Sequence, residues 1–456
     1  MKDIDTLLKE VKKIHMIGIG GSGMCPIAEI LHKEGYELTG SDNNESDPLQ
    51  RVRNMGVDVK MGHSPDNIGD AEMVIHTAAL LKDNVELLAA RERGIPTFER
   101  SEILGAISRL YGNCIGVCGT HGKTTTSSML TQVLLTAGMD PSAVIGGKLP
   151  LIDSYGRVGH SDTFVCEACE FVDTFLKLSP RTAILLNIDD DHLDYFKTMD
   201  NLKKSFTKFC SMADVVIYNG DDKNTLDAIS NVCGDKKYIT FGRNESNDYC
   251  AKNVVMKSGK ATFDVYKYGE YVVSLHLVAP GEHNVYNALA TFSAADNEGA
   301  SVEDIKKGIE TFYGAGRRFE KLGEYKGVTI FDDYAHHPTE LRATLNSAMQ
   351  MGYNTVWAVF QPFTFSRTKM LFDDFVDVLK IPDKCVMSEI MGSREVNTFG
   401  IYTADLAKEI PGSVWFKTFG EIADYVAENA KPGDMVITLG CGDIYKAARM
   451  IVDRLK

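Results

Sequence analysis

The sequence predicts an α/β protein of three domains, with a Rossmann-like domain at each end and a P-loop-type domain between them. Short β-branched runs alternate with helical stretches along most of the chain, the pattern of parallel sheets covered by helices. Two glycine-rich turns each follow an apolar strand and precede a helix. The chain has 456 residues, more than a single hydrophobic core usually spans. The expected domains are residues 1–110, 111–313 and 314–456.

The first domain opens with the run KKIHMIGIG, which predicts a strand that ends in a glycine turn. The run SGMCPIAEILHKEG predicts the next helix, YELTGSD a second strand and EMVIHTAA a later strand of the same sheet. Strands that end in glycine and aspartate are typical of a doubly wound sheet, whose ligands bind at the carboxyl edge. We therefore expect a ligand site at that edge.

The second domain opens at NCIGVCGTHGKTTT, an apolar strand followed by a glycine turn and a helix. Further strands are expected at TFVCEAC, RTAILLNI, DVVIYNG and KYITFG, and antiparallel strands between about 248 and 280. The run NVYNALATFSAADNEG predicts a helix. The third domain begins near GAGRRFE, and its expected strands are VTIFDDYA, NTVWAVFQP, DKCVMSEI and DMVITLG.

The composition is that of a globular protein with an acidic surface. Lys and Arg number 49 against 63 Asp and Glu, and the net charge of -14 argues against nucleic acid or an anionic membrane as a partner. The sequence has no secretory signal and no apolar run of about 18 residues. Its ten cysteines are scattered, and the C-x-x-C of Cys166 and Cys169 is interpreted as buried thiols. We expect a cytoplasmic protein.

The turn G-T-H-G-K-T-T, residues 119–125, predicts a phosphate-binding loop. Its glycines let backbone N–H groups approach phosphate oxygens, Lys123 can reach the β- and γ-phosphates, and the Thr124 hydroxyl can bind Mg²⁺. The usual spacing would put a glycine where this chain has Val117, so the motif is a variant. A plain glycine turn would not need the Lys-Thr pair, which favours nucleotide binding.

Glu167 and His192 are candidate metal ligands beside this loop. Glu167 follows the apolar run TFVC, and His192 follows RTAILLNI within NIDDDHLD. The carboxyl ends of parallel strands meet at one edge, so both residues are expected near Lys123 and Thr124. A carboxylate and a neutral imidazole can complete metal coordination around ATP oxygens. For His192 alone, a surface or capping role would be an equally good interpretation.

The first glycine turn, Gly18-x-Gly20-x-x-Gly23, admits a different class of enzyme. Asp42 follows nineteen residues after Gly23, as in dinucleotide-dependent oxidoreductases. The second nucleotide loop argues against that class, because a simple dehydrogenase does not need one. A non-catalytic nucleotide switch is a third alternative, but it would not require a third α/β domain that begins with two arginines.

Several motifs together resemble the Mur ligase family. They are GTHGKTTT, EACE after a strand, NIDDDHLD, PGEHNVYNA, GAGRRFE and DDYAHHPTE, in order between about residues 14 and 445. The resemblance implies a UDP-sugar domain, a central ATPase domain and a C-terminal domain that receives the amino acid. It implies ATP and Mg²⁺, with UDP-N-acetylmuramate and L-alanine joined through an acyl phosphate in peptidoglycan precursor synthesis. One branch of the family attaches a recycled murein peptide instead.

The resemblance also implies roles for individual residues. Those implied at ATP are Gly119, Thr120, His121, Gly122, Lys123, Thr124, Thr125, His283, Asn284, Asn287, Arg317 and Arg318. The implied magnesium ligands are Thr124, Glu167 and His192. Those implied at the UDP-sugar are Gly20, Gly21, Ser22, Gly23, Met24, Ser41, Asp42, His63 and Thr77. Those implied at the reacting end of the substrate are Asp333, Tyr334, His336 and Arg367.

Four of these residues, Lys123, His192, His336 and Arg367, are expected to be catalytic. His336 is the candidate base for the incoming amine. Arg367 is expected to hold the amino-acid carboxylate, because a guanidinium matches a carboxylate in bidentate fashion. The alternative for Arg367 is a surface ion pair with a nearby acid such as Asp373.

Three positions depart from patterns found in the family. Phe206, in LKKSFTKF, stands where some members carry a carbamoylated lysine between two metals, with Lys204 and Lys208 close by. In FQPFTFSRTK, Phe363 and Thr364 stand where members commonly show histidine and, in some cases, arginine. These departures leave the identity of the amino acid open.

Overall fold

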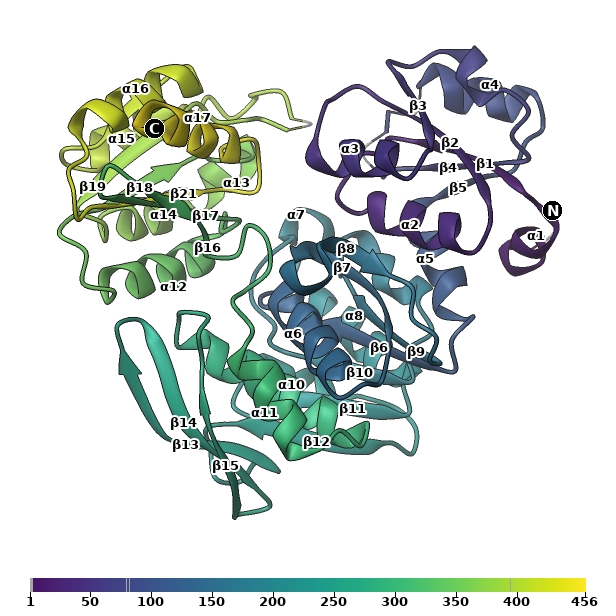
Figure 1. Cartoon of the computed structure of the whole chain (residues 1–456), viewed down its shortest axis with the longest axis horizontal. Helices are drawn as coiled ribbons and strands as arrows, with labels where there is room; N and C mark the ends of the chain where they lie inside the picture. The colour runs from purple at the N-terminus through teal and green to yellow at the C-terminus, as the bar shows by residue number, and fades with distance from the viewer. Residues whose placement is uncertain (1–2, 79, 82, 394) are drawn as a thin grey trace. The chain divides into compact units, whose positions relative to one another are not determined.

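The computed structural model describes residues 3–78, 80–81, 83–393 and 395–456, and these form three β-sheets (Figure 1). They divide into two compact units. One contains Met1–Ala251, Val265–Val273 and Tyr286–Ile309; the other contains Lys252–Asp264, Ser274–Val285 and Glu310–Lys456. Within the described ranges, no helix is both long and apolar enough to cross a membrane. The domain limits expected at 110 and 313 stay predictions.

The first sheet has the strand order β3-β2-β1-β4-β5, with every neighbouring pair parallel. Its strands are β1 (Lys13–Ile17), β2 (Glu37–Asp42), β3 (Asp58–Met61), β4 (Met73–His76) and β5 (Thr97–Glu99). The helices are α1 (Ile4–Glu10), α2 (Cys25–Lys33), α3 (Asp47–Asn54), η1 (Pro65–Ile68), α4 (Val85–Glu92) and α5 (Arg100–Ser108). The order reverses between β1 and β4, as in a Rossmann fold. The expected Rossmann-like class is confirmed, although Ala79, at the end of the predicted EMVIHTAA strand, lies outside the described residues.

Burial explains why this sheet is doubly wound. Ile14 and Met16 of β1 are buried in one hydrophobic cluster with residues of α2, whereas Ile17 and Val74 are buried in another with residues of α4. A parallel sheet buries both faces because its crossover helices cover them. The carboxyl edge is left for the glycine turn.

The second sheet has the order β15-β14-β13-β12-β11-β10-β6-β9-β7-β8. Its strands are β6 (Asn113–Cys118), β7 (Ser142–Leu149), β8 (Ser154–Arg157), β9 (Thr163–Glu167), β10 (Thr182–Leu185), β11 (Val215–Asn219), β12 (Lys237–Gly242), β13 (Tyr249–Lys257), β14 (Lys260–Lys267) and β15 (Glu270–His276). Its helices are α6 (Lys123–Thr136), η2 (Pro150–Ile152), η3 (Phe171–Lys177), α7 (Leu193–Phe196), α8 (Met199–Met212), α9 (Lys223–Ile229), α10 (His283–Asn297) and α11 (Val302–Glu310). β9, β6, β10, β11 and β12 are parallel to their neighbours.

The turns after β13 and β14 explain the expected hairpins between 248 and 280. Each turn has two residues, Ser258-Gly259 and Tyr268-Gly269, and all four have positive φ. Positive φ at both central residues is the type I′ geometry that matches the twist of antiparallel strands. α6 buries Met129, Leu130, Val133 and Leu134, whereas Ala137, which the same helical period puts on this face, is partly exposed.

The third sheet has the order β16-β17-β21-β18-β19-β20, in which β16 and β17 are antiparallel and the other pairs are parallel. Its strands are β16 (Glu320–Tyr325), β17 (Val328–Asp333), β18 (Val356–Phe360), β19 (Lys384–Ser388), β20 (Val414–Phe416) and β21 (Met435–Leu439). Its helices are α12 (Pro338–Met349), α13 (Phe365–Met370), α14 (Phe372–Val378), α15 (Thr403–Glu409), α16 (Phe419–Asn429) and α17 (Tyr445–Leu455).

Candidate active site

The phosphate loop lies where the sequence predicts it, between β6 and α6. Gly119 and Gly122 have φ angles of 133° and 89°, in the region that favours glycine. A Cβ on Gly122 would lie 2.5 Å from Oδ1 of Asn287, on α10. Among the described residues, no side chain caps the N-terminus of α6, which starts at Lys123. An uncapped helix N-terminus behind a glycine turn suits a bound phosphate.

Residues that follow β10 hold the phosphate loop through hydrogen bonds. Asn187 accepts the His121 N–H through Oδ1 at 2.8 Å and donates through Nδ2 to the His121 carbonyl at 3.0 Å. The His121 Nε2 lies 3.0 Å from Oδ2 of Asp189, whose own N–H donates to the Thr120 hydroxyl. The sequence pattern predicts one metal ligand, His192, in NIDDDHLD but does not predict the positioning role of Asn187 and Asp189. Their one signal was their place after a strand next to β6.

Lys123 forms a buried ion pair that the sequence did not predict. Its Nζ lies 2.9 Å from Oε2 of Glu170 and donates to the carbonyls of Gly119 at 2.6 Å and Thr120 at 3.0 Å. The Glu170 side chain is only 1% exposed. Burial would lower the pKa of Lys123, but the Glu170 carboxylate outweighs it and the net pKa is raised. Lys123 therefore stays charged and held at the loop.

The proposed metal ligands flank the loop on neighbouring strands. Glu167 ends β9, in register with Val117 of β6, and accepts the Gly146 N–H at 3.0 Å. Thr124 is buried in the first turn of α6. His192 lies beyond β10, the neighbour of β6 on its other side. A hydroxyl and a carboxylate are hard oxygen donors, so this set fits Mg²⁺ by its chemistry.

Backbone strain marks the same region. His192 has a φ of 57°, and Val172 and Asp173, just after Glu170, have φ angles of 55° and 57°. A left-handed β-branched residue such as Val172 is a genuine outlier. The two strained segments meet where the His192 ring lies 4.7 Å from the Phe171 ring. Such strain concentrates at functional sites, so it supports a role for His192.

An aromatic residue occupies the position at which some family members carry a carbamoylated lysine. Phe206, which stands in the place of the carbamoylated lysine, is fully buried and packs edge-on against Phe175 at 5.5 Å. Lys204 and Lys208 are exposed on α8. Cys166 is fully buried, as interpreted from the sequence, whereas Cys169 is partly exposed, and its surroundings raise its pKa to about 11.

The glycines of the first turn each meet a neighbouring element closely. A Cβ on Gly18 would lie 2.6 Å from Cγ2 of Thr77, after β4. A Cβ on Gly20 would lie 2.7 Å from Cβ of Leu49. The Gly20 N–H donates to Oδ2 of Asp42 at 2.9 Å. Asp42 thus holds the turn in place, whereas an oxidoreductase would use it for a ribose hydroxyl.

A buried carboxylate, Glu86, contacts two of the residues expected at the UDP-sugar, Ser41 and His63. Its oxygens accept the Ser41 hydroxyl at 2.6 Å and the Ser64 N–H at 3.1 Å, and lie 3.3 Å from Nε2 of His15 and 3.5 Å from Nδ1 of His63. Burial would raise the pKa of Glu86, but these hydrogen bonds lower it to about 2. The sequence pattern did not predict this role of Glu86, for which the signal is a charged residue on the buried side of α4.

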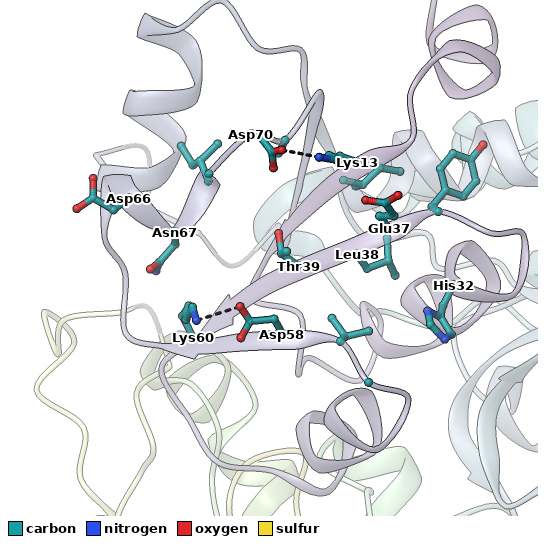
Figure 2. A pocket seen from close by; sticks show the side chains of 17 residues that line it. Lys13, His32, Glu37, Leu38, Thr39, Asp58, Lys60, Asp66, Asn67 and Asp70 are labelled. Atoms are coloured by element: carbon teal, nitrogen blue, oxygen red, sulfur yellow. Dashed lines mark hydrogen bonds and ion pairs between the residues drawn. The ribbon is translucent and has the colours of Figure 1, made fainter.

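Figure 2 shows a separate cavity of about 680 Å³ in the same sheet. Lys13, Glu37 and Asp58, the first residues of β1, β2 and β3, line it. It therefore opens at the amino ends of these strands, opposite to the glycine turn, and ligands of such sheets bind at the carboxyl ends. We do not assign this cavity to the site.

The structure separates the two arginines expected at ATP. Arg317 is used inside its own unit: its Nε lies 2.9 Å from Oδ2 of Asp332, its Nη2 donates to the Gly440 carbonyl at 2.7 Å, and its guanidinium lies 5.0 Å from the Tyr334 ring. Arg318 lies over the same ring at 4.8 Å. A phosphate contact by Arg317 would break these hydrogen bonds.

Asp333, Tyr334 and His336 form one cluster after β17. Asp333 accepts the N–H groups of Phe319 at 2.7 Å and Ala335 at 2.8 Å, so its carboxylate organises the loop. Burial raises the pKa of Asp333 to about 6. The His336 ring lies 5.7 Å from the Tyr334 ring.

The surroundings of His336 favour its protonated form, whereas a general base must first be unprotonated. Its Nδ1 lies 3.2 Å from Oε2 of Glu340. Burial would lower the pKa of His336, but Cys441 and Glu340 raise it to about 10. In these surroundings the imidazole would have to lose a proton before it could act as a base near neutral pH. The expected role of His336 as a base stays a prediction.

The remaining candidate residues make the following contacts. Phe363 places its ring 6.5 Å from His336, and Arg367 lies on α13, whose N-cap is Thr364. Asn284 donates to the Pro280 carbonyl at 2.6 Å, and His283 lies beside Gly281. Asn287 accepts the Thr126 hydroxyl at 3.3 Å, which joins α10 to the helix of the phosphate loop.

In the described residues, a Rossmann-like sheet, a phosphate-loop sheet and a third mixed sheet define a nucleotide-binding protein of three α/β parts. Family models match each part. Residues 13–111 match the Mur ligase family catalytic domain, 117–295 the Mur ligase middle domain and 317–442 the Mur ligase glutamate ligase domain. The chain belongs to the Mur ligase family.

Curated relatives are similar over their full length. The chain is 41% identical over 451 residues to the UDP-N-acetylmuramate–L-alanine ligase of Acetivibrio thermocellus, covering 97% of this chain and 96% of the relative. The structure of UDP-N-acetylmuramate-alanine ligase from Thermotoga maritima matches with a TM-score of 0.85 and 28% identity, covering 97% and 98%. A murein peptide ligase from Psychrobacter arcticus matches with a TM-score of 0.77 and 24% identity over 97% and 98%, which shows a shared fold.

The Lys123–Glu170 pair predicts a charge-dependent loss of stability. We expect Glu170→Gln to lower the free energy of unfolding of the ligand-free protein by about 3 kcal/mol, because it leaves a buried ammonium without its anion. Urea unfolding measures this change. The double variant Glu170→Gln/Lys123→Met removes both charges and should recover much of the loss. An equal loss in both variants would mean that Glu170 acts through packing.

The His336 environment predicts a pH-dependent loss of stability. The folded pKa of about 10 exceeds the ordinary 6.5, so the imidazolium stabilises the folded state fully below pH 6.5 and less as the pH rises through 10. We expect His336→Gln to cost on the order of 1–3 kcal/mol near pH 6 and little above pH 10. Unfolding titrations across this range measure it; a constant difference would contradict the charged state.

Proposed function

We propose that this protein is an ATP-dependent ligase of the cytoplasm that joins L-alanine to the carboxylate of UDP-N-acetylmuramate in peptidoglycan precursor synthesis. The observation that carries the proposal is the full-length similarity to ligases of that name, at 41% identity for one of them. The paired Lys123 at the phosphate loop supports ATP as the energy source, because it supplies a fixed cation where phosphoryl transfer needs one.

In the first step, the muramate carboxylate attacks the γ-phosphorus of ATP, forming an acyl phosphate and releasing ADP. Lys123 and the loop N–H groups offset the negative charge that builds up on the transferred phosphoryl group. Thr124, Glu167 and His192 would hold Mg²⁺, which supplies Lewis-acid stabilisation of the phosphate oxygens when bound. Asn187 and Asp189 keep the loop in the geometry that this step requires.

In the second step, the amine of L-alanine attacks the acyl carbon, the amide bond forms and phosphate leaves. The amine loses one proton, and the departing phosphate can accept it. His336 belongs to the cluster of Asp333 and Tyr334, and we assign it to the reacting end of the substrate. Arg367 is assigned to the alanine carboxylate. Acyl phosphates hydrolyse, so these residues must also act where water is excluded.

The reaction class predicts a dependence on three substrates. Phosphate release from ATP should require both UDP-N-acetylmuramate and an amino acid, and L-alanine should be preferred in a panel of amino acids. Lys123→Ala should lower turnover by at least about a hundredfold, the scale for losing a preorganised charge stabiliser. Lys208→Ala, which removes an exposed lysine of α8, is the control. Hydride transfer with tight NAD binding would contradict the proposal.

The proposed contact between Arg367 and the carboxylate of L-alanine predicts how the protein selects L-alanine over a peptide. Arg367→Lys loses bidentate geometry, so the apparent KM for L-alanine should rise about tenfold or more, with smaller effects on ATP and the UDP-sugar. Arg342→Lys, at an exposed position of α12, is the matched control. In a ligase that attaches a recycled peptide, the carboxylate of the first residue lies within a peptide bond. An unchanged KM, or a wild type that prefers L-Ala-γ-D-Glu peptides, would favour that activity.

A further inference from the structure

Arg100 brings a guanidinium to the glycine turn of the first sheet. It is the first residue of α5 and directly follows β5. The register of the sheet aligns the last residues of β1, β4 and β5. Gly18, Thr77 and Arg100 directly follow these residues, so they lie at the same level of the carboxyl edge. The position of Arg100 is therefore equivalent to those of Gly18, which begins the glycine turn, and Thr77, which is expected at the UDP-sugar.

The Arg100 side chain lies against the last glycine of the turn. A Cβ on Gly23 would lie 3.2 Å from Cδ, 3.3 Å from Nε and 3.5 Å from Cζ of Arg100. Glycine at this position thus makes room for the guanidinium. Within the described part of the chain, the N–H groups of Ser22 and Gly23 donate no hydrogen bond, whereas that of Met24 donates to the Gly21 carbonyl at 2.9 Å.

Arg100 differs in its pairing from other arginines of this region. Arg51, Arg53 and Arg109 each form an ion pair with an acid, and Arg109, on the C-terminal side of α5, pairs with Asp5 at 2.8 Å. Among the described residues, Arg100 has no such partner.

The acids closest to Arg100 in sequence serve the helix instead. Glu99 accepts the Ser101 N–H at 2.9 Å, and Glu102 accepts the Glu99 N–H at 2.9 Å, forming a capping box. A cation in the first turn of a helix faces the positive end of the helix dipole, which is unfavourable. The fold itself therefore gives no reason for an arginine here.

We propose that Arg100 binds the diphosphate of the UDP-sugar and sets the preference for a nucleoside diphosphate over a nucleoside. This inference rests on the proposed function. A guanidinium presents parallel N–H donors that match two phosphate oxygens. In a chain with a net charge of -14, a diphosphate needs such a local cation beside the open N–H groups of the turn.

The test compares the affinities of UDP and uridine for the full-length protein by calorimetry, without ATP. Arg100→Ala should weaken UDP binding by about ten- to a hundredfold and leave uridine binding unchanged within about twofold, because charge-assisted phosphate contacts are lost. Arg100→Lys keeps the charge without the bidentate geometry and should fall between. Arg109→Ala, which changes an arginine near the other end of the same helix, is the matched control.

Each outcome decides a different claim. Unchanged UDP binding in Arg100→Ala, or an equal loss for UDP and uridine, overturns the role of Arg100. If Arg100→Ala does not fold, the same comparison in Arg100→Lys decides, and equal UDP affinity to wild type overturns the bidentate contact. A wild type that binds neither UDP nor UDP-N-acetylmuramate overturns the proposed function itself.

Discussion

The ion pair between Lys123 and the buried carboxylate of Glu170 is the interaction on which the central site depends. An unpaired cation in this environment would be costly, so Glu170, 2.9 Å away, must accompany it. Lys123 also donates to two loop carbonyls, which couples its charge to the conformation of the loop. The loop in turn needs glycine at the positive-φ positions 119 and 122 and is held by Asn187 and Asp189. The charge of Lys123, the backbone of the loop and the residues that follow β10 therefore together shape the position expected for phosphate.

The same geometric rule builds both nucleotide turns. In a parallel sheet the carboxyl ends of adjacent strands meet at one edge, so residues distant in sequence become neighbours there. In the first sheet this rule aligns Gly18, Thr77 and Arg100. In the second it places Glu167 of β9 beside the loop that follows β6. Short polar stretches after strands thus carry most of the candidate chemistry, while the strands supply rigid spacing.

Several charged residues serve the fold before they serve any ligand. Arg317 is held by Asp332 and by backbone carbonyls, and both oxygens of Asp333 accept backbone N–H groups. Glu86 is buried among hydroxyl, amide and imidazole partners, and its pKa of about 2 keeps it ionised. Buried charges must find such partners, because desolvation without them is unfavourable. Within each unit, fixed charges therefore orient residues that are expected to touch substrate.

The sequence alone determined the fold class, the two glycine turns and the family, because strand periodicity and turn chemistry are local properties. It also identified Lys123 and Thr124, whose role follows from adjacent residues of one motif. It did not reveal Glu170, Glu86 or Arg100, because each acts through a contact with a residue distant in sequence. Nor could it separate Arg317 from Arg318, adjacent residues of one type. Only the tertiary structure decided which side chains form ion pairs within the protein, since pairing depends on distance in space and not on spacing along the chain.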